Sequence, residues 1–460
     1  MITPRTLKGF RDYLPAVMIP RESMMQIGRE VFRSFGYAPI DTPVLEYFEI
    51  LTGKGSDETD RQMFHFTDNG GREVGMRFDL TVPLARFAAQ HTHQLGTPFK
   101  RYHIAPVFRG ENPQAGRYRE FVQADFDTIG TTSVVADVET LTVINTLLER
   151  LGLRRFTIRV NNRAILSGLL DQLGLAEHTS AVLRCLDKLD KIGVDAVDKE
   201  LRQSAGITTE QATQVLRLAQ CKNASDSVGA ADSAGAAESV FQTLQDLSMG
   251  HEGMAAGIER LQQVYSGTLA AGVPADRLRI DVSIARGLDY YTGIIFETIL
   301  DELPAIGSVC SGGRYDNLAG LYTKQHLPGI GGSLGLDRLV AAMEQLKLLP
   351  QASTPAEVLV TQFNEAHRDD YLALATHLRR GGLRVELYPD AKKLKAQLKY
   401  AAEKGFRVAV IAGDDEWQRG VVQVKDLHSR QSDDVAYAAD APEELVSAIA
   451  SCLEQTRGAG

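Results

Sequence analysis

The sequence predicts a mixed α/β (α+β) protein, in which an antiparallel-sheet domain is interrupted by a helical insertion and followed by a small α/β domain. At 460 residues with 44% hydrophobic content, the chain can form about three domains of roughly 150 residues each. Strand and helix patterns alternate over residues 1–162, give way to helix-rich sequence over 163–277, and resume over 278–348. Residues 356–460 carry a second, different alternation.

The first segment combines short helices with one long pair of strands. Residues 20–35 and 80–90 have helical periodicity, and residues 37–45 favour an extended chain. Alternating residues from 100 to 109 and from 118 to 127 then predict two antiparallel strands, because the stretch between them is rich in turn-forming residues.

The middle segment lacks strand alternation and contains helical patterns such as residues 179–192 and 210–218. Its centre, residues 224–239, consists mostly of Ala, Ser, Gly and Asp, which predicts a mobile loop. Strand alternation returns at residues 279–284 and 294–298, which we interpret as a hairpin that rejoins the first sheet.

The last segment alternates strands with helices. Strands are expected at residues 357–361, 384–388 and 407–411, with helices at 365–380 and 394–403 between them. This order is typical of a small α/β domain with parallel strands.

Composition argues against several classes of protein. The first ten residues carry no apolar signal region, and no stretch approaches the roughly 18 apolar residues of a membrane helix. We therefore expect a cytoplasmic protein with no membrane partner. Four scattered cysteines without Cys-x-x-Cys spacing predict neither disulfides nor a zinc cluster. The net charge of −9 means that any nucleic acid must be bound by local basic patches.

Two arginines far apart in the sequence are placed to bind an anion. Arg109 ends the first strand of the long pair, and Arg338 lies in the first turn of a helix expected over residues 336–346. A cation at a helix N-terminus is unfavourable by up to about 1 kcal/mol unless an anion accompanies it. The glycine-rich residues 329–335 just before this helix let such an anion approach the backbone. Together these features predict a site for nucleotide phosphates.

The returning strand carries a row of polar residues. A two-residue side-chain period places Gln123, Asp125 and Asp127 on one face of it. Gln123 alone is also consistent with an ordinary exposed strand residue. Asp79, taken alone, is consistent with a cap for the helix that follows it.

Read together, these stretches resemble a class II aminoacyl-tRNA synthetase, and specifically a histidyl-tRNA synthetase. Residues 8–15 resemble the opening motif of that family, and residues 36–46, 108–127 and 331–339 resemble its three class motifs. Two further stretches are specific to the histidine enzymes: Ala-Arg-Gly-Leu-Asp-Tyr-Tyr at 285–291 and Ser-Gly-Gly-Arg-Tyr-Asp at 311–316. Residues 399–401 and 420–427 are similar to the anticodon-binding domain of the family.

The resemblance implies a reaction in which L-histidine is activated with ATP and transferred to tRNA(His). The carboxylate of histidine and the α-phosphate of ATP repel each other by roughly 4 kcal/mol at 4 Å and an effective dielectric of 20, so fixed cations must offset this. Arg109 and Arg286 are expected there, with Arg338 at the γ-phosphate and Glu111 at the ATP. Mg²⁺ is inferred from the nucleotide alone, since the sequence shows no metal-ligand spacing. The first class motif implies a homodimer.

The resemblance also assigns the histidine ligands. Asp79, Thr81 and Gln123 are expected to bind the α-ammonium group, and Asp127 with Tyr290 or Tyr291 to span the imidazole. Outside this motif, the two tyrosines would be interpreted as half-buried strand aromatics.

Two groups of residues are candidates for tRNA contacts. Residues 379–407 contain nine Lys or Arg and three acids, a net of +6 on an acidic protein. This predicts a tRNA surface that includes Lys392, Lys395 and Lys399, although a solvated basic helix has the same composition. In the loop of the long strand pair, the candidates for the acceptor end are Gln114, Arg117 and Arg119.

Two other functions remain as alternatives. The glycines at 329–335 approach a dinucleotide fingerprint, but residue 334 is leucine and no suitable acid follows. The stronger rival is a non-catalytic, histidine-binding regulatory subunit of histidine biosynthesis. Such paralogues lack the anticodon domain and tend to lose the ATP arginines, whereas this chain keeps Arg109, Arg338 and a C-terminal domain, which favours the enzyme.

Overall fold

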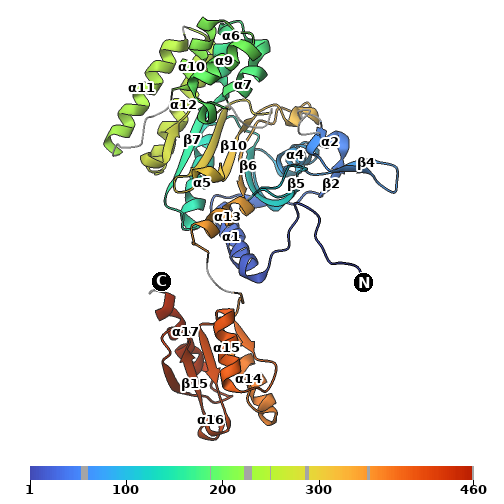
Figure 1. Cartoon of the computed structure of the whole chain (residues 1–460), viewed down its shortest axis with the longest axis vertical. Coiled ribbons are helices and arrows are strands. Elements are labelled where there is room, and N and C mark those ends of the chain that lie inside the picture. The colour runs from blue at the N-terminus through green and yellow to red at the C-terminus, as the bar shows by residue number, and fades with distance from the viewer. Residues whose placement is uncertain are drawn as a thin grey trace. The chain divides into compact units, whose positions relative to one another are not determined.

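The computed structural model describes residues 1–52, 61–114, 116–186, 188–221, 230–248, 250–284, 290–349 and 353–457. The chain divides into two compact units (Figure 1). The first contains residues 1–11 and 24–348, and the second contains residues 12–23 and 349–460.

The first unit is built on an eight-stranded sheet. Its spatial order is β1 (Ala38–Pro39), β5 (Phe99–Phe108), β6 (Glu120–Ile129), β11 (Gly329–Gly335), β10 (Cys310–Tyr315), β9 (Ile294–Leu300), β7 (Phe156–Asn162) and β8 (Leu278–Ile280). The two edge strands pair in parallel, and all inner pairs are antiparallel. The predicted antiparallel sheet is thus confirmed, and the long pair β5–β6 begins and ends within two residues of its predicted bounds.

The predicted hairpin of residues 279–284 and 294–298 is wrong. Strands β8 and β9 lie in the same sheet, but β7 lies between them and pairs with both. Strand β7 follows helix α5 (Val134–Arg150), and every described residue of β7 except Arg159 is buried. A strand buried on both faces shows no alternation, so its pattern does not reveal its neighbours.

Helices pack against this sheet, in part through aromatic contacts. On β6, Phe126 stacks on Phe32 of α1 (Pro15–Ser34), with ring centroids 5.2 Å apart. Helix α5 starts where the side chain of Ser133 accepts a hydrogen bond from the backbone N–H of Val135, a standard N-cap. Further helices are α2 (Phe48–Thr52), α4 (Thr81–Leu95) and α13 (Leu336–Gln345).

All elements between residues 163 and 277 in the described part of the chain are helical. They are α6 (Arg163–Gln172), η1 (Ala176–His178), α7 (Thr179–Leu186), α8 (Leu189–Ile192), α9 (Val194–Ser204), α10 (Thr209–Ala219), α11 (Ala230–Ser248), α12 (Glu252–Ala270) and η2 (Ala275–Arg277). Figure 1 shows them gathered beside the β7 end of the sheet.

The loop predicted at residues 224–239 is wrong from residue 230 onward, because α11 begins there. Alanine is the strongest helix former, and this stretch is rich in it. The helix is held by a buried face that includes Val240, Phe241 and Leu244. Residues 224–229 of the predicted loop lie outside the described residues.

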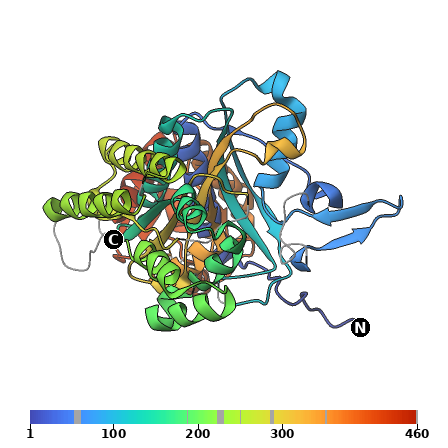
Figure 2. The same cartoon turned by 90° about the horizontal axis from the view of Figure 1, so that it is seen from above.

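A small three-stranded sheet projects from the first unit. Its order is β2 (Leu45–Tyr47), β4 (Glu73–Met76) and β3 (His65–Thr67), all antiparallel. Figure 2 shows this sheet extending away from the main body of the unit. It leaves Leu45, Tyr47 and Phe66 exposed.

The second unit is a five-stranded sheet with helices. Its order is β13 (Val385–Leu387), β12 (Val358–Val360), β14 (Val408–Ile411), β15 (Val421–Asp426) and β16 (Ser432–Ala436). The helices are η5 (Glu365–His367), α14 (Arg368–Arg380), α15 (Leu394–Lys404), α16 (Asp414–Arg419) and α17 (Glu443–Arg457). The predicted parallel strands are confirmed in β13, β12 and β14, while the last two strands are antiparallel.

The described part of the chain contains no helix that is both long and apolar enough to span a membrane.

Candidate functional site

The candidate site lies on one face of strands β5, β6 and β11. In the strand register, Asp127 of β6 is opposite Arg101 of β5 and Gly331 of β11. Asp125 is opposite Ser333 of β11. Directly opposite residues share a face of the sheet, so these groups meet where the sequence predicted a polar row.

Glycine at position 331 makes room for the carboxylate of Asp127. A Cβ atom there would lie 2.0 Å from Asp127 Oδ1, far below van der Waals contact. A side chain at 331 would therefore displace Asp127.

Asp127 is buried and bound by two partners that the sequence did not predict. The hydroxyl of Tyr315 donates a hydrogen bond to Asp127 Oδ1 at 2.6 Å. Arg101 Nη2 lies 2.7 Å from Asp127 Oδ2, with the two side chains 0% and 3% exposed. Burial raises the pKa of Asp127, and the charge of Arg101 and the Tyr315 hydrogen bond counteract this.

Tyr315 is held in place by its neighbour on β10. Arg314 is also buried, and its Nη2 lies 2.5 Å from Oδ1 of Asp137 on helix α5. This ion pair fixes the strand that presents the Tyr315 hydroxyl to Asp127.

The two predicted tyrosines also line this region. Tyr290 and Tyr291 contact each other edge to face, with ring centroids 5.0 Å apart. Burial, followed by the charges of Asp127 and Asp125, raises the pKa of Tyr291. Tyr291 therefore lies within electrostatic range of Asp127, while the direct hydrogen bond to Asp127 comes from Tyr315.

Gln123 and Asp125 each keep one acceptor atom unused. Gln123 Nε2 donates to the hydroxyl of Ser333 at 2.8 Å. Gln123 Oε1 and Asp125 Oδ1 are buried and have no hydrogen-bond partner among the described residues. Buried polar atoms are normally paired, so unpaired acceptors on one face indicate a guest that brings donors.

Asp79 performs the capping role that was the alternative interpretation. Its Oδ1 accepts hydrogen bonds from the backbone N–H groups of Thr81 (3.0 Å) and Val82 (2.9 Å), at the start of α4. Asp79 also lies near Tyr290. Burial raises the pKa of Tyr290, and the charge of Asp79 raises it further. Thr81 lies beside the Tyr290 hydroxyl and lowers that pKa.

Three arginines converge at the other end of the site. Burial lowers the pKa of Arg338, and the charges of Arg117 and Arg109 lower it further. Glu111 lies 3.9 Å from both Arg109 Nη1 and Arg117 Nη1. Arg109 and Arg117 therefore lie within electrostatic range of Arg338.

The guanidinium of Arg109 is fixed by aromatic rings. It lies 4.4 Å from the ring centroid of Phe78 and 5.2 Å from that of Phe121. Its Nε donates to the carbonyl of Phe78 at 3.1 Å. Since Nε is hydrogen-bonded and two rings contact the guanidinium, the guanidinium is held in one orientation, with Nη1 3.9 Å from Glu111 and Nη2 left for a ligand.

The loop between β5 and β6 packs against the first turn of α13. At Gly116, with φ +71°, an added Cβ would lie 3.5 Å from the Cα of Arg338 and 3.5 Å from Ala341. In the same turn of α13, Asp337 Oδ2 accepts a hydrogen bond from the backbone N–H of Val122 on β6 at 2.7 Å. These contacts place Arg117 beside Arg338.

Asp79 is close to both groups of residues. Burial raises the pKa of Asp79, while the charges of Arg109 and Arg101 lower it. Asp79 thus lies within electrostatic range of Arg109, at the arginine end, and of Asp125 and Asp127, at the carboxylate end. Such a site can bind one guest that is anionic at one end and cationic at the other.

Arg286 lies within residues 285–289, outside the described residues, so its predicted place stays a prediction.

The candidates for tRNA contacts have different surroundings. Gln114 and Arg117 form a backbone bridge in the loop. The guanidinium of Arg119 donates to the carbonyls of Glu111 (3.1 Å) and Lys8 (3.3 Å). Arg119 thus ties the loop to the N-terminal segment, a structural role that the sequence did not indicate.

On α15 and just before it, the basic residues are exposed, as a tRNA surface requires. Lys392, Lys395 and Lys399 are all exposed. Lys392 lies 3.1 Å from Asp390, and Lys399 lies 3.6 Å from Glu403. Exposed ion pairs of this kind are weak, so they leave the lysines available for phosphates.

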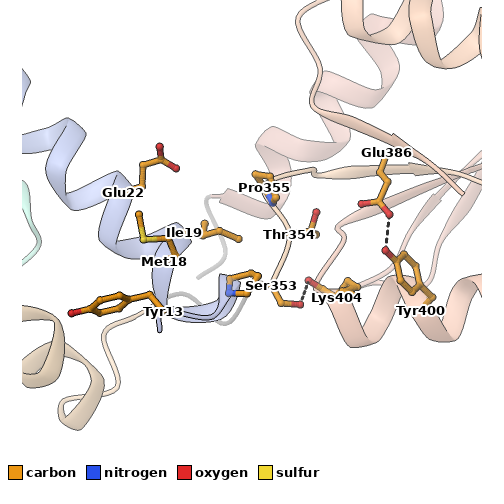
Figure 3. A pocket seen from close by; sticks show the side chains of 11 residues that line it. Tyr13, Met18, Ile19, Glu22, Ser353, Thr354, Pro355, Glu386, Tyr400 and Lys404 are labelled. Atoms are coloured by element: carbon orange, nitrogen blue, oxygen red, sulfur yellow. Dashed lines mark hydrogen bonds between the residues drawn. The ribbon is translucent and has the colours of Figure 1, made fainter. Parts of the chain in front are cut away.

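The second unit contains a separate pocket of about 340 Å³ (Figure 3). Tyr400 and Glu386 lie on one side of it and form a hydrogen bond of 2.6 Å. Met18 and Ile19 from the N-terminal residues of this unit lie on the opposite side. None of the predicted substrate-binding residues lines it.

The described residues contain no group of three or more His, Cys, Asp or Glu side chains that could hold a metal ion.

Comparisons with known proteins match nearly the whole length of the chain. The sequence profile described as "Histidyl-tRNA synthetase" matches residues 9–339, and that of an "Anticodon binding domain" matches residues 357–447. A histidine–tRNA ligase of Rhodopirellula baltica is 66% identical over 98% of this chain and 99% of the relative. A histidine–tRNA ligase of Wolinella succinogenes is 46% identical over 93% of this chain and 94% of the relative. The crystal structure of a histidyl-tRNA synthetase from Nostoc sp. superposes with a TM-score of 0.83 at 32% identity, covering 95% of this chain and 97% of that chain.

Proposed function

The chain belongs to the histidyl-tRNA synthetase family, and from this premise we infer that it is an ATP-dependent histidine–tRNA ligase. In the first step, a carboxylate oxygen of L-histidine attacks the α-phosphorus of ATP. A new P–O bond forms, the bond to the β-phosphate breaks, and pyrophosphate leaves. In the second step, a terminal hydroxyl of tRNA(His) attacks the carbonyl carbon of the adenylate, and AMP leaves.

The observation that carries this proposal is the opposite charge of the two ends of one site. Arg109, Arg117 and Arg338 converge at one end, and buried carboxylates with one arginine, Arg101, form the other. A triphosphate fits the first end and an α-ammonium group fits the second. We assign Arg109 to the α-phosphate, where its fixed guanidinium stabilises the charge of the transition state, and Arg338 to the γ-phosphate.

At the carboxylate end, we propose that the free Oε1 of Gln123 accepts from the α-ammonium group together with Asp79 and Thr81. Asp127, held by Arg101 and Tyr315, then accepts from the imidazole, and the Tyr291 ring lines its pocket. Such a site rejects apolar side chains, because an unpaired buried carboxylate is costly.

Mg²⁺ is proposed as a companion of the nucleotide. Mg²⁺ commonly binds through one or two carboxylates and the phosphates of its substrate. Glu111 fits this requirement, since its carboxylate lies between Arg109 and Arg117. When bound, the ion would neutralise phosphate charge.

For the transfer step, no side chain is assigned as general base, because a phosphate oxygen of the adenylate can accept the proton of the tRNA hydroxyl. We propose that the exposed lysines Lys392, Lys395 and Lys399 contact the tRNA backbone, and that Gln114 lies near the acceptor end. Because charging supplies translation, we place the protein in the cytoplasm.

We also propose a homodimer. The projecting sheet exposes Leu45, Tyr47 and Phe66, and a hollow of about 900 Å³ in the first unit is lined by residues 39–44 and by β5. Both features adjoin the stretch that resembles the first class motif. Sedimentation should therefore give a mass of about twice the 50.3 kDa chain, and a monomer at micromolar concentration would contradict this.

The alternative of a non-catalytic regulatory subunit is not favoured, because the relatives match across the anticodon-binding domain as well. Histidine-dependent exchange of pyrophosphate into ATP tests the choice. We expect exchange with L-histidine and none without it; folded protein that shows no exchange would support the regulatory function.

Arg286 is assigned to the histidine carboxylate and the α-phosphate by family resemblance. We predict that Arg286→Ala abolishes exchange while the thermal midpoint and the oligomeric state stay unchanged. Exchange at the wild-type rate would refute this assignment.

A further inference from the structure

Asp125 lies in the middle of the polar row on β6, and the assignments above give it no role. We propose that Asp125 is a further histidine-binding residue, whose Oδ1 accepts a hydrogen bond from a positively charged N–H group of the bound amino acid. This inference rests on the proposed function and adds a ligand to the same site.

Burial and missing partners are the first argument. Asp125 is 1% exposed, and its Oδ1 has no hydrogen-bond partner among the described residues. By contrast, Asp127 Oδ1 accepts a hydrogen bond from Tyr315, and Asp127 Oδ2, which also lacks a hydrogen bond among the described residues, is ion-paired with Arg101. A buried carboxylate oxygen without a donor is strongly unfavourable, so the site favours a guest that supplies one.

The position of Asp125 is the second argument. Alternate residues on a strand are roughly 6.8 Å apart, and Asp125 lies between Gln123 and Asp127 on the same face. A histidine whose ammonium group lies near Gln123 and whose ring lies near Asp127 must pass Asp125. Ser333, opposite on β11, interacts with Asp125 and lowers its pKa, but this leaves Oδ1 unpaired.

The balance of charge is the third argument. The charges around Asp125 are Arg101 on β5, Asp127 on β6, and Asp79 before α4. The charge of Asp125 also raises the pKa of Arg77. However, the guanidinium of Arg77 donates to the backbone carbonyls of Thr42 and Pro106 at 2.6 and 2.8 Å. Asp79 also lies near Arg109, and Arg101 is already paired with Asp127, so the described residues give Asp125 no ion-paired cation of its own.

Uncharged neighbours do not correct this imbalance. Tyr291 and Cys310 both lie within electrostatic range of Asp125, and neither carries a positive charge. Burial raises the pKa of Asp125 to about 7, with Arg101 opposing this and Asp127 adding to it. A bound cation would relieve the excess of negative charge.

The test is Asp125→Asn, which keeps the shape and removes the charge. A hydrogen bond between charged groups is worth about ten- to a hundredfold in affinity. We expect the KM for histidine in pyrophosphate exchange to rise by this factor, while the KM for ATP stays within twofold. An unchanged KM for histidine would overturn the proposal.

Calorimetric titration identifies which group of histidine is bound. The probes are L-histidine and imidazolepropionate, which has the ring and carboxylate but no ammonium group. Equal losses of affinity for both probes in Asp125→Asn would assign the ring N–H, and a loss for histidine alone would assign the ammonium group. No loss for either probe would overturn the proposal.

Stability separates binding from a structural role. Replacing a buried carboxylate that has no ion-paired cation with an amide should leave the thermal midpoint of the ligand-free protein unchanged or higher, whereas a structural Asp125 would give a lower midpoint. Asp125→Ser provides a second, smaller replacement with the same expected result.

Two controls complete the experiment. Glu357→Gln removes a largely buried, ion-paired carboxylate of the second unit, and it should leave the histidine affinity unchanged. Wild-type protein without histidine-dependent exchange would count against the proposed function itself. Active wild type with an unaffected Asp125→Asn variant counts against this inference alone.

Discussion

Replacing Arg101 with methionine should destabilise the first unit specifically. The pair with Asp127 is buried, with its charged atoms 2.7 Å apart. Coulomb attraction at that distance amounts to about 6 kcal/mol at an effective dielectric of 20, and desolvation offsets part of it. Since removal of one partner leaves Asp127 uncompensated beside Asp125, we expect a loss of about 3–5 kcal/mol in unfolding free energy at pH 7.

Urea unfolding followed by two probes measures this loss. Trp417, the single tryptophan, lies in the second unit, so its fluorescence reports that unit, while far-UV circular dichroism also reports the first. The circular dichroism midpoint should fall in Arg101→Met and the tryptophan midpoint should not. The double variant Arg101→Met/Asp127→Asn should recover most of the loss, because the uncompensated charge is gone. A stable single variant, or purely additive effects, would refute the reasoning.

Three further predictions concern the site. Tyr315→Phe removes the hydrogen bond to Asp127 and should raise the KM for histidine about five- to tenfold, with the KM for ATP as the internal control. Arg338→Ala should raise the KM for ATP more than tenfold in pyrophosphate exchange and leave histidine binding unchanged; an unchanged KM for ATP would exclude Arg338 from the phosphate site. The pKa of Asp125 rises from 3.8 to about 7 on folding, so the folded chain keeps a proton there that the unfolded chain releases. The thermal midpoint of ligand-free protein should therefore fall as pH rises from about 4 to about 7, and fall less in Asp125→Asn; identical pH profiles would contradict this.

Local patterns in the sequence predicted most of the strands and helices. The pair β5–β6 could be predicted because its alternation and its turn residues are local, and the parallel strands of the second unit could be predicted from their spacing. The position of β7 between β8 and β9 could not, since strand order depends on packing between distant segments. The helix α11 was missed because composition alone does not show that Phe241 and Leu244 are buried.

The site was predicted in its chemistry more than in its contacts. The row Gln123, Asp125 and Asp127 follows from the strand period, and the convergence of Arg109 with Arg338 follows from their need for an anion. Arg101 and Tyr315 were missed as partners of Asp127, because their contacts depend on strand register. The contact between Arg101 and Asp127 could have been predicted from the register of β5 against β6, which places the two residues directly opposite each other.

A crystal structure of this protein with ATP and L-histidine tests the central claim most directly. The account predicts the α-phosphate beside Arg109, the γ-phosphate beside Arg338, and the histidine along β6 with its ring at Asp127. A nucleotide bound away from these arginines, or histidine bound outside the carboxylate end, would contradict it.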